Sequence, residues 1–228
     1  MSFDLIVLDD AAAAARRTGE LLAETAHAGG HIALSGGTSP ELAYRTAAHL
    51  APDWSRVNLW WGDERCVPPD DERSNYAMAK RTLLDELTVG PRVHRIRGEA
   101  EPDAAATEYD EALRGVRRLR LNLLGIGPDG HTASLFPNTA GLHERERLAI
   151  AAKPGLDPSV MRVTMTPRML ANADLVLFLV TGEAKAGAAR RAFEEPPDDS
   201  TPASRIRSRD GQTIALLDRA AASGLASI

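Results

Sequence analysis

Short apolar runs alternate along the chain with longer stretches of helical character. The strand-like runs are residues 5–8, 32–34, 57–61, 93–96, 121–124, 148–151, 175–180 and 213–217. The helical stretches are residues 11–28, 40–50, 75–87 and 102–116, and two more follow Thr166 and Gly182. Apolar runs this short indicate buried strands. The β-α-β-α order therefore predicts a Rossmann-like, doubly wound α/β fold with a mostly parallel sheet covered by helices on both faces.

The length and composition favour one domain over residues 1–228. The hydrophobic fraction is 43% and the charged fraction is 26%, which is ordinary for a soluble globular protein. No apolar run is long enough to span a bilayer, and the N-terminus lacks the features of a signal peptide, so we expect a cytoplasmic protein without a membrane partner. The single cysteine, Cys66, excludes an intramolecular disulfide and a cysteine-based metal site.

The charge balance argues against a nucleic-acid partner. The formal net charge is −5 and the pI is near 5.7, whereas a nucleic-acid surface shows a basic excess gathered on one face. Residues 114–120 form the densest basic run, and we interpret them as a solvated helix end, where cations interact favourably with the helix dipole.

The segment 123–137 runs from a buried strand into a glycine-rich turn that presents Asp129 and His131. Glycines at 125, 127 and 130 permit backbone angles that other residues resist, so the chain can turn sharply there. In α/β proteins ligands bind beyond the carboxyl ends of the strands, which makes both side chains candidate catalytic residues. The alternative is a tight turn in which Asp129 caps a helix and His131 lies on the surface.

The segment 33–40 follows the second strand and opens a helix at Pro40. Its glycines, Gly36 and Gly37, and its hydroxyls, Ser35 and Thr38, are typical of an anion cradle, because free backbone N–H groups at a helix start attract phosphate. The segment lacks the lysine of a P-loop and is not GxGxxG, which favours a small phosphorylated metabolite over a nucleotide. A capped turn without a ligand is the alternative.

Polar residues also follow the third strand, where Asp63 and Arg65 are two positions apart. Asp63 could act as an acid or a base or could orient a substrate hydroxyl, and Arg65 could bind phosphate. A salt bridge that braces the loop is the alternative.

Two cations further along could join a phosphate site. Arg162 lies in the segment 162–166, and Lys185 opens a helix after a strand. The helix dipole disfavours a cation in the first turn, so the position of Lys185 suggests an anion nearby, although exposed lysines are common. Residues 155–159 contain glycine and proline and predict a loop near Arg162.

Taken together, five ordered blocks resemble the 6-phosphogluconolactonase family over nearly the whole chain. The blocks are residues 35–40, residues 62–65 with 74–76 after them, residues 127–137, residues 162–166 and residues 182–186. The resemblance implies the sugar-phosphate isomerase-like α/β fold that this family shares with glucosamine-6-phosphate deaminase. It also implies hydrolysis of 6-phosphoglucono-δ-lactone to 6-phosphogluconate in the pentose phosphate pathway.

By that resemblance His131 is the general base that activates water, and Asp129 or Asp63 orients it or polarises the substrate. A δ-lactone is an activated ester, so an imidazole and a water suffice without a covalent nucleophile, a metal or a cofactor. We expect a sugar-phosphate lactone as the ligand and a monomer or weak homo-oligomer as the assembly. The expected phosphate-binding residues are Ser35, Gly36, Gly37 and Thr38 of the cradle, together with the cations Arg162 and Lys185. Arg65 and Arg73 are weaker candidates.

Two other functions compete with the lactonase. The deaminase shares the Asp-Gly-His turn, but the glutamate that it is thought to use in ring opening is replaced here by Phe136, which cannot transfer a proton. A non-catalytic sugar-phosphate sensor would keep the phosphate cradle and lose the acid–base groups. Retention of Asp63, Asp129 and His131 argues against the sensor.

Overall fold

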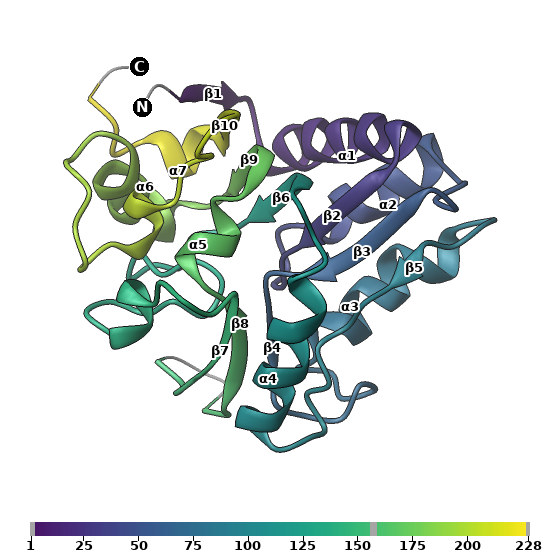
Figure 1. The fold of residues 1–228 in the computed structure, drawn as a ribbon. Helices are drawn as coiled ribbons and strands as arrows, with labels where there is room; N and C mark the ends of the chain where they lie inside the picture. The colour runs from purple at the N-terminus through teal and green to yellow at the C-terminus, as the bar shows by residue number, and fades with distance from the viewer. Residues whose placement is uncertain (1–2, 156–158, 227–228) are drawn as a thin grey trace.

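All but one of the predicted strands join a single parallel sheet in the computed structural model, which describes residues 3–155 and 159–226 (Figure 1). Every pair of neighbouring strands is parallel. The predicted mostly parallel α/β sheet is thereby confirmed. Across the sheet the strands are β1 (Asp4–Leu8), β10 (Gln212–Asp218), β9 (Ala173–Val180), β6 (Leu119–Leu124), β2 (Gly30–Leu34), β3 (Val57–Trp61) and β5 (Arg92–Val93).

Helices flank this sheet and bury its apolar side chains (Figure 1). The helix α1 (Ala11–Ala28) begins where the Asp10 carboxylate accepts a hydrogen bond from the Ala13 N–H at 2.6 Å. Gly19 allows α1 to pack closely on α2, because a Cβ there would lie 2.7 Å from the Ala43 carbonyl oxygen. The remaining helices are α2 (Glu41–Leu50), α3 (Asn75–Thr82), α4 (Pro102–Leu113), α5 (Pro167–Leu170), α6 (Ala186–Phe193) and α7 (Arg219–Ala222).

The order of the strands places a topological switch point between β2 and β6. From β2 the chain moves outward through β3 to β5, and it then returns to the other side of β2 as β6. The connections after β2 and β6 therefore depart in opposite directions, and a crevice opens between the carboxyl ends of the two strands. Both the Ser35–Thr38 segment and the Asp129–His131 turn begin at this crevice.

The strand predicted at 148–151 lies outside the central sheet, which corrects its expected place in the parallel array. It forms β7 (Ala149–Ala152), which pairs antiparallel with β8 (Arg162–Met165), and β8 pairs in the same way with β4 (Asp63–Arg65). The hydrophobic pattern of a strand does not show which strands it pairs with. An apolar run alone therefore does not distinguish a place in the central sheet from a place in a second sheet. The loop predicted at 155–159 falls mainly on residues 156–158, which lie outside the described residues.

Two boundaries also differ from the prediction. The strand expected at 93–96 keeps only Arg92–Val93, and the helix expected to reach residue 87 ends at Thr82. Leu83 leaves the helical conformation with φ −132°, and a short 3₁₀ helix, η1 (Leu84–Glu86), follows. Three more 3₁₀ helices are η2 (Ala140–His143), η3 (Glu183–Lys185) and η4 (Pro202–Arg205).

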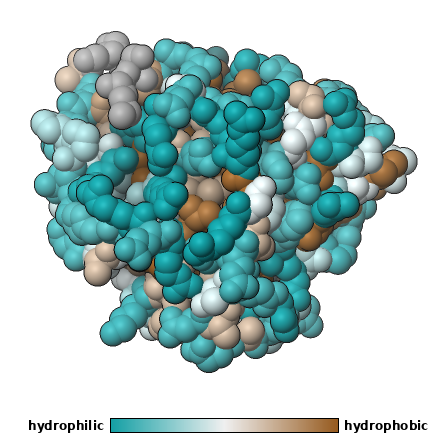
Figure 2. All heavy atoms as spheres, viewed as in Figure 1, coloured by the Kyte–Doolittle hydropathy of each residue, from teal (hydrophilic) through white to brown (hydrophobic). Residues whose placement is uncertain are grey.

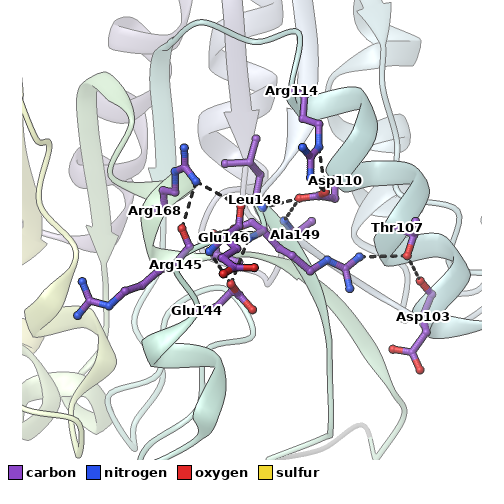
Figure 3. Close-up of polar contacts among 12 residues, drawn as sticks. Asp103, Thr107, Asp110, Arg114, Glu144, Arg145, Glu146, Leu148, Ala149 and Arg168 are labelled. Carbon is purple, nitrogen blue, oxygen red and sulfur yellow. Dashed lines mark hydrogen bonds and ion pairs between the residues drawn. The ribbon is translucent and has the colours of Figure 1, made fainter.

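A buried carboxylate joins α4 to β7 (Figure 3). The Asp110 side chain is buried and accepts hydrogen bonds from the backbone N–H groups of Leu148 and Ala149 and from the Arg114 guanidinium. Burial by itself would raise the pKa of Asp110, but these donors outweigh it and lower the pKa. The small sheet is therefore held against the helix by a charge-assisted contact.

The surface on the face shown in Figure 2 is mainly hydrophilic, with scattered hydrophobic residues between. In residues 3–155 and 159–226, no helix combines the length and the apolar character that crossing a membrane requires.

We predict that Asp110→Ala lowers the free energy of unfolding by about 1–3 kcal/mol, because it leaves buried N–H groups without an acceptor. Urea unfolding measures the change. Glu111→Ala is the control, since Glu111 is exposed on the same helix and should change stability by less than about 0.5 kcal/mol. Equal stability of the two variants would contradict the role of Asp110.

Candidate active site

A cleft of about 280 Å³ lies at the carboxyl ends of β2 and β6, where the switch point predicts one. It brings together residues from segments that are far apart in the sequence. Its lining comprises Ser35, Gly36, Gly37, Asp63, Arg65, Asn75, Gly125, Ile126, Gly127, Pro128, His131, Ala133, Phe136, Arg162 and Lys185.

The turn after β6 is closed by its own backbone. The Gly127 N–H donates to the His131 carbonyl at 2.9 Å, and the Gly130 N–H donates to the Gly127 carbonyl at 2.9 Å. Gly130 has φ +93°, a conformation that favours glycine, and a Cβ on Gly127 would overlap the His131 ring. These two glycines are therefore required for the turn to present His131 to the cleft.

Within this turn Asp129 holds the His131 imidazole. Asp129 Oδ1 lies 2.6 Å from His131 Nδ1 and also accepts the His131 backbone N–H at 3.1 Å. Burial alone would raise the pKa of Asp129, but the contacts with His131 outweigh it and lower the pKa. The carboxylate thus favours the tautomer with a proton on Nδ1 and leaves Nε2 able to accept a proton.

Asp63 is buried beside this pair, and protein donors occupy both of its carboxylate oxygens. Ser134 Oγ donates to Oδ2 at 2.6 Å, and Asn75 Nδ2 donates to Oδ1 at 3.1 Å. Asn75 Nδ2 also donates to the Asp63 carbonyl at 2.8 Å. Asp63 therefore connects β4, the start of α3 and the turn that carries His131.

The small antiparallel sheet places two arginines side by side. Arg65 on β4 is directly opposite Arg162 on β8, so both side chains lie on one face of the sheet, with Asp63 and Thr164 as the next pair on that face. Burial lowers the pKa of Arg162, and the Asp63 charge opposes that shift. Two guanidinium groups that face a cleft together suit an anionic ligand.

Glu64 points to the other face of the same strand and fixes the start of α3. Its carboxylate accepts the backbone N–H groups of Arg65, Asn75 and Tyr76 at 2.7, 2.7 and 2.8 Å, and the Ser74 hydroxyl at 3.0 Å. Burial raises the pKa of Glu64, although these donors act against the shift. Glu64 therefore supports the position of Asn75 without lining the cleft.

The Ser35–Thr38 segment has the free donors expected of an anion cradle. Within the described ranges, the N–H groups of Gly36, Gly37 and Thr38 donate to no protein acceptor. Ser39 Oγ lies 2.9 Å from Thr181 Oγ1 and connects the segment to the end of β9. Lys185 lines the same cleft from η3, where burial lowers its pKa and the Asp129 charge opposes that shift.

Three sequence candidates do not line the cleft: Arg73, Thr38 and Asp129, which contacts the lining residue His131. Arg73 is held by Asp71 through hydrogen bonds at 2.8 and 2.6 Å, which turn its guanidinium toward that carboxylate. Thr38 is exposed beyond the cradle. Conversely, Ser134 and Asn75 contact Asp63 although the sequence reasoning gave them no role. Both lie in the blocks that carry the family resemblance, but only their position beside Asp63 indicates what they do.

Phe136 lines the cleft beside the His131 imidazole. Its ring centroid lies 5.0 Å from that of His131, and the Arg162 guanidinium lies 5.7 Å from the Phe136 ring centroid. The cleft thus has an apolar wall next to the imidazole. A phenyl ring there supplies shape and a cation–π contact, and it supplies no proton.

We predict that Gly36→Ala lowers the free energy of unfolding by about 1–3 kcal/mol, because the new Cβ would overlap the Asn75 side chain. Thermal or urea unfolding measures the loss. Gly90→Ala is the control, since no atom lies within 4 Å of a Cβ at Gly90. A Gly36→Ala protein as stable as Gly90→Ala would show that the cradle is not packed on Asn75.

The chain is similar over most of its length to known proteins. A family model described as "Glucosamine-6-phosphate isomerases/6-phosphogluconolactonase" matches residues 9–215. A 6-phosphogluconolactonase of Haemophilus influenzae is 36% identical over 84% of this chain and 85% of that protein, and one of Streptomyces coelicolor is 34% identical over 97% and 92%.

Solved structures agree with these sequence matches. A 6-phosphogluconolactonase of Trypanosoma brucei has a TM-score of 0.85 and 27% identity, covering 99% of both chains. A monomeric glucosamine-6-phosphate deaminase has the same TM-score at 20% identity, which shows the shared fold alone. The chain therefore belongs to the glucosamine-6-phosphate isomerase/6-phosphogluconolactonase family.

Proposed function

We propose that this chain hydrolyses 6-phosphoglucono-δ-lactone to 6-phosphogluconate, with His131 as the base that activates water. The chain is an enzyme of the lactonase type, since relatives named 6-phosphogluconolactonase match it at 34–39% identity. The observation that carries the residue assignment is the Asp129–His131 pair at 2.6 Å, presented to a cleft that also holds a cradle for an anion.

The substrate phosphate is assigned to the cradle. The free N–H groups of Gly36 and Gly37 can donate to phosphate oxygens, and Lys185 and Arg162 supply positive charge on the same cleft. Charge-assisted hydrogen bonds to a fixed phosphate hold the far end of the sugar acid at one distance from His131. The bound phosphate therefore determines where the lactone carbonyl lies relative to His131.

His131 then acts on the water. Asp129 keeps the Nδ1 proton in place, so Nε2 accepts a proton from the water as its oxygen bonds to the lactone carbonyl carbon. The tetrahedral intermediate collapses with cleavage of the bond between that carbon and the ring oxygen. The proton held by His131 passes to the departing ring oxygen, and the products are a carboxylic acid and a hydroxyl on one chain.

Asp63 and Asp129 have different roles in this proposal. Asp129 contacts the imidazole directly and orients it. Both Asp63 oxygens already accept hydrogen bonds from Ser134 and Asn75, so Asp63 fixes the His131 turn against β4 and α3. Its charge also balances Arg162 when the cleft holds no substrate. We therefore assign Asp63 as a positioning residue.

Phe136 favours the lactonase over the deaminase. Ring opening of an amino sugar needs an acid–base group near the ring oxygen, and the side chain beside His131 at this position is a phenyl ring. A sensor would need the cradle but no oriented base, so the Asp129–His131 pair favours catalysis over sensing. We retain the expectations of a cytoplasmic monomer or weak homo-oligomer that acts without a metal, a cofactor or nucleic acid.

We predict that His131→Ala lowers kcat for lactone hydrolysis by about 10²–10⁴-fold, because the variant lacks the base. The assay follows freshly generated 6-phosphoglucono-δ-lactone above its spontaneous rate, with glucosamine 6-phosphate as the alternative substrate. His143→Ala is a matched control, since His143 also pairs with an aspartate, Asp199, at 2.8 Å but lies outside the cleft. No acceleration by the native protein would refute the proposal, and turnover of the amino sugar would favour the deaminase.

A second prediction follows from Lys185. Burial lowers its pKa, so in the free protein Lys185 loses its charge at a lower pH than an ordinary lysine does. The affinity for 6-phosphogluconate should therefore fall as pH rises through that lowered pKa. Lys185→Arg keeps the charge at alkaline pH and should flatten the profile. Identical profiles for the two proteins, measured by calorimetry, would exclude Lys185 from the phosphate site.

A further inference from the structure

A second cleft, here called the arginine cleft, lies between η2, α5 and the segment that follows η4. Its volume is about 340 Å³, and its lining includes Arg145, Arg168, Arg205 and Arg209. In the described part of the chain its only acidic lining residue is Glu144. The arginine cleft shares no lining residue with the cleft at the carboxyl ends of β2 and β6, here called the substrate cleft. The proposed lactonase reaction therefore gives the arginine cleft no role.

The single carboxylate in the lining does not neutralise the arginines. Glu144 accepts the backbone N–H groups of Glu146 and Arg147 at 2.7 and 3.1 Å, which uses it to close a local turn. Figure 3 shows the Arg145 side chain extended away from Glu144. Arg168 donates to the carbonyl oxygens of Arg145 and Glu146 at 3.1 and 3.2 Å, and these neutral acceptors leave its charge uncompensated.

The other two arginines differ from each other. Arg205 pairs with Asp199, whereas the Arg209 guanidinium donates to the Arg168 carbonyl oxygen at 3.4 Å. Over residues 3–155 and 159–226, no carboxylate lies within 4 Å of the guanidinium groups of Arg145, Arg168 or Arg209. Three uncompensated cations thus gather at one cleft of a protein whose net charge is −5. Like charges held together repel, and a bound anion would remove that cost.

The positive surface continues beyond the arginine cleft. An adjoining hollow of about 270 Å³ shares Arg168 and Arg209 with it and adds Arg114 and Arg117. Arg114 pairs with Asp110, but Arg117 has no carboxylate partner in the described ranges. A hollow lined by one sign of charge concentrates the electric field and attracts ligands of the opposite sign. Two connected hollows suit a ligand with more than one anionic group.

We propose that the arginine cleft binds a small molecule that carries two or more phosphate groups. Guanidinium groups bind phosphate through paired N–H donors, and arginines supply all the full positive charges of the lining, with no lysine among them. The concave shape favours a small molecule over an extended polymer.

Calorimetric titration with pyrophosphate at low ionic strength tests this proposal. The native protein should show two sites, of which Lys185→Ala weakens the one in the substrate cleft. The double variant Arg145→Gln with Arg209→Gln should lose the other by about tenfold or more, because each removed guanidinium takes away charge-assisted hydrogen bonds. Its kcat/KM for the lactone should stay unchanged. Arg168 is left intact because it holds backbone carbonyls.

The matched control is Arg16→Gln with Arg92→Gln, which makes the same change in net charge at two exposed arginines outside the cleft. This control should keep both sites. Three results would overturn the proposal: one pyrophosphate site that only Lys185→Ala affects, equal weakening by both double variants, or binding of long polyphosphate without binding of pyrophosphate. If the native protein does not hydrolyse the lactone, the proposed function is refuted, and the pyrophosphate result still decides whether the arginine cleft binds an anion.

Discussion

The pairing of β2 with β6 is the constraint on which the site depends. Ile32 is opposite Leu121 and Ala33 is opposite Asn122, so two strands separated by nearly ninety residues of sequence end side by side. Because the chain turns away in opposite directions after these strands, a cleft remains between the two connections. The cradle at Gly36 and Gly37 and the turn of Asp129 and His131 face each other across that space. An anion and a reacting carbonyl can therefore be held by backbone that the sheet itself keeps rigid.

The small antiparallel sheet of β4, β8 and β7 contributes charged side chains to the cleft. Asp63 is opposite Thr164 and Arg65 is opposite Arg162, so one face presents a carboxylate and two guanidinium groups to the cleft. The burial of Arg162 is unfavourable by itself, and the nearby Asp63 charge offsets part of that cost. Ser134 and Asn75 in turn hold Asp63, which connects the charge balance of the cleft to the position of the turn that carries His131. The contacts of Asp63 therefore affect both the charge of the cleft and the position of the turn that carries His131.

The fold of this chain does not by itself identify its reaction. The fold is shared with a glucosamine-6-phosphate deaminase at 20% identity, so the sheet does not determine the reaction. In this chain the side chain next to His131 is Phe136, which gives the cleft an apolar surface and supplies no proton. The arginine cleft shares no lining residue with the cleft that holds His131.

The sequence by itself determined the alternation of strands and helices, the glycine-rich turns at strand ends and the residue types that can hold phosphate or move a proton. These features are local, since they depend on hydrophobic period and on the backbone freedom of residues such as Gly130. Tertiary structure decided which strands pair, and it moved β7 and β8 into a separate sheet where Arg162 meets Arg65. It also decided that Arg73 turns to Asp71 and that Ser134 and Asn75 reach Asp63. The Asp63–Ser134 contact joins residues far apart in sequence, whereas Arg73 and Asp71 are only two residues apart. In both cases the pattern along the chain does not record which of several polar partners a folded side chain will contact.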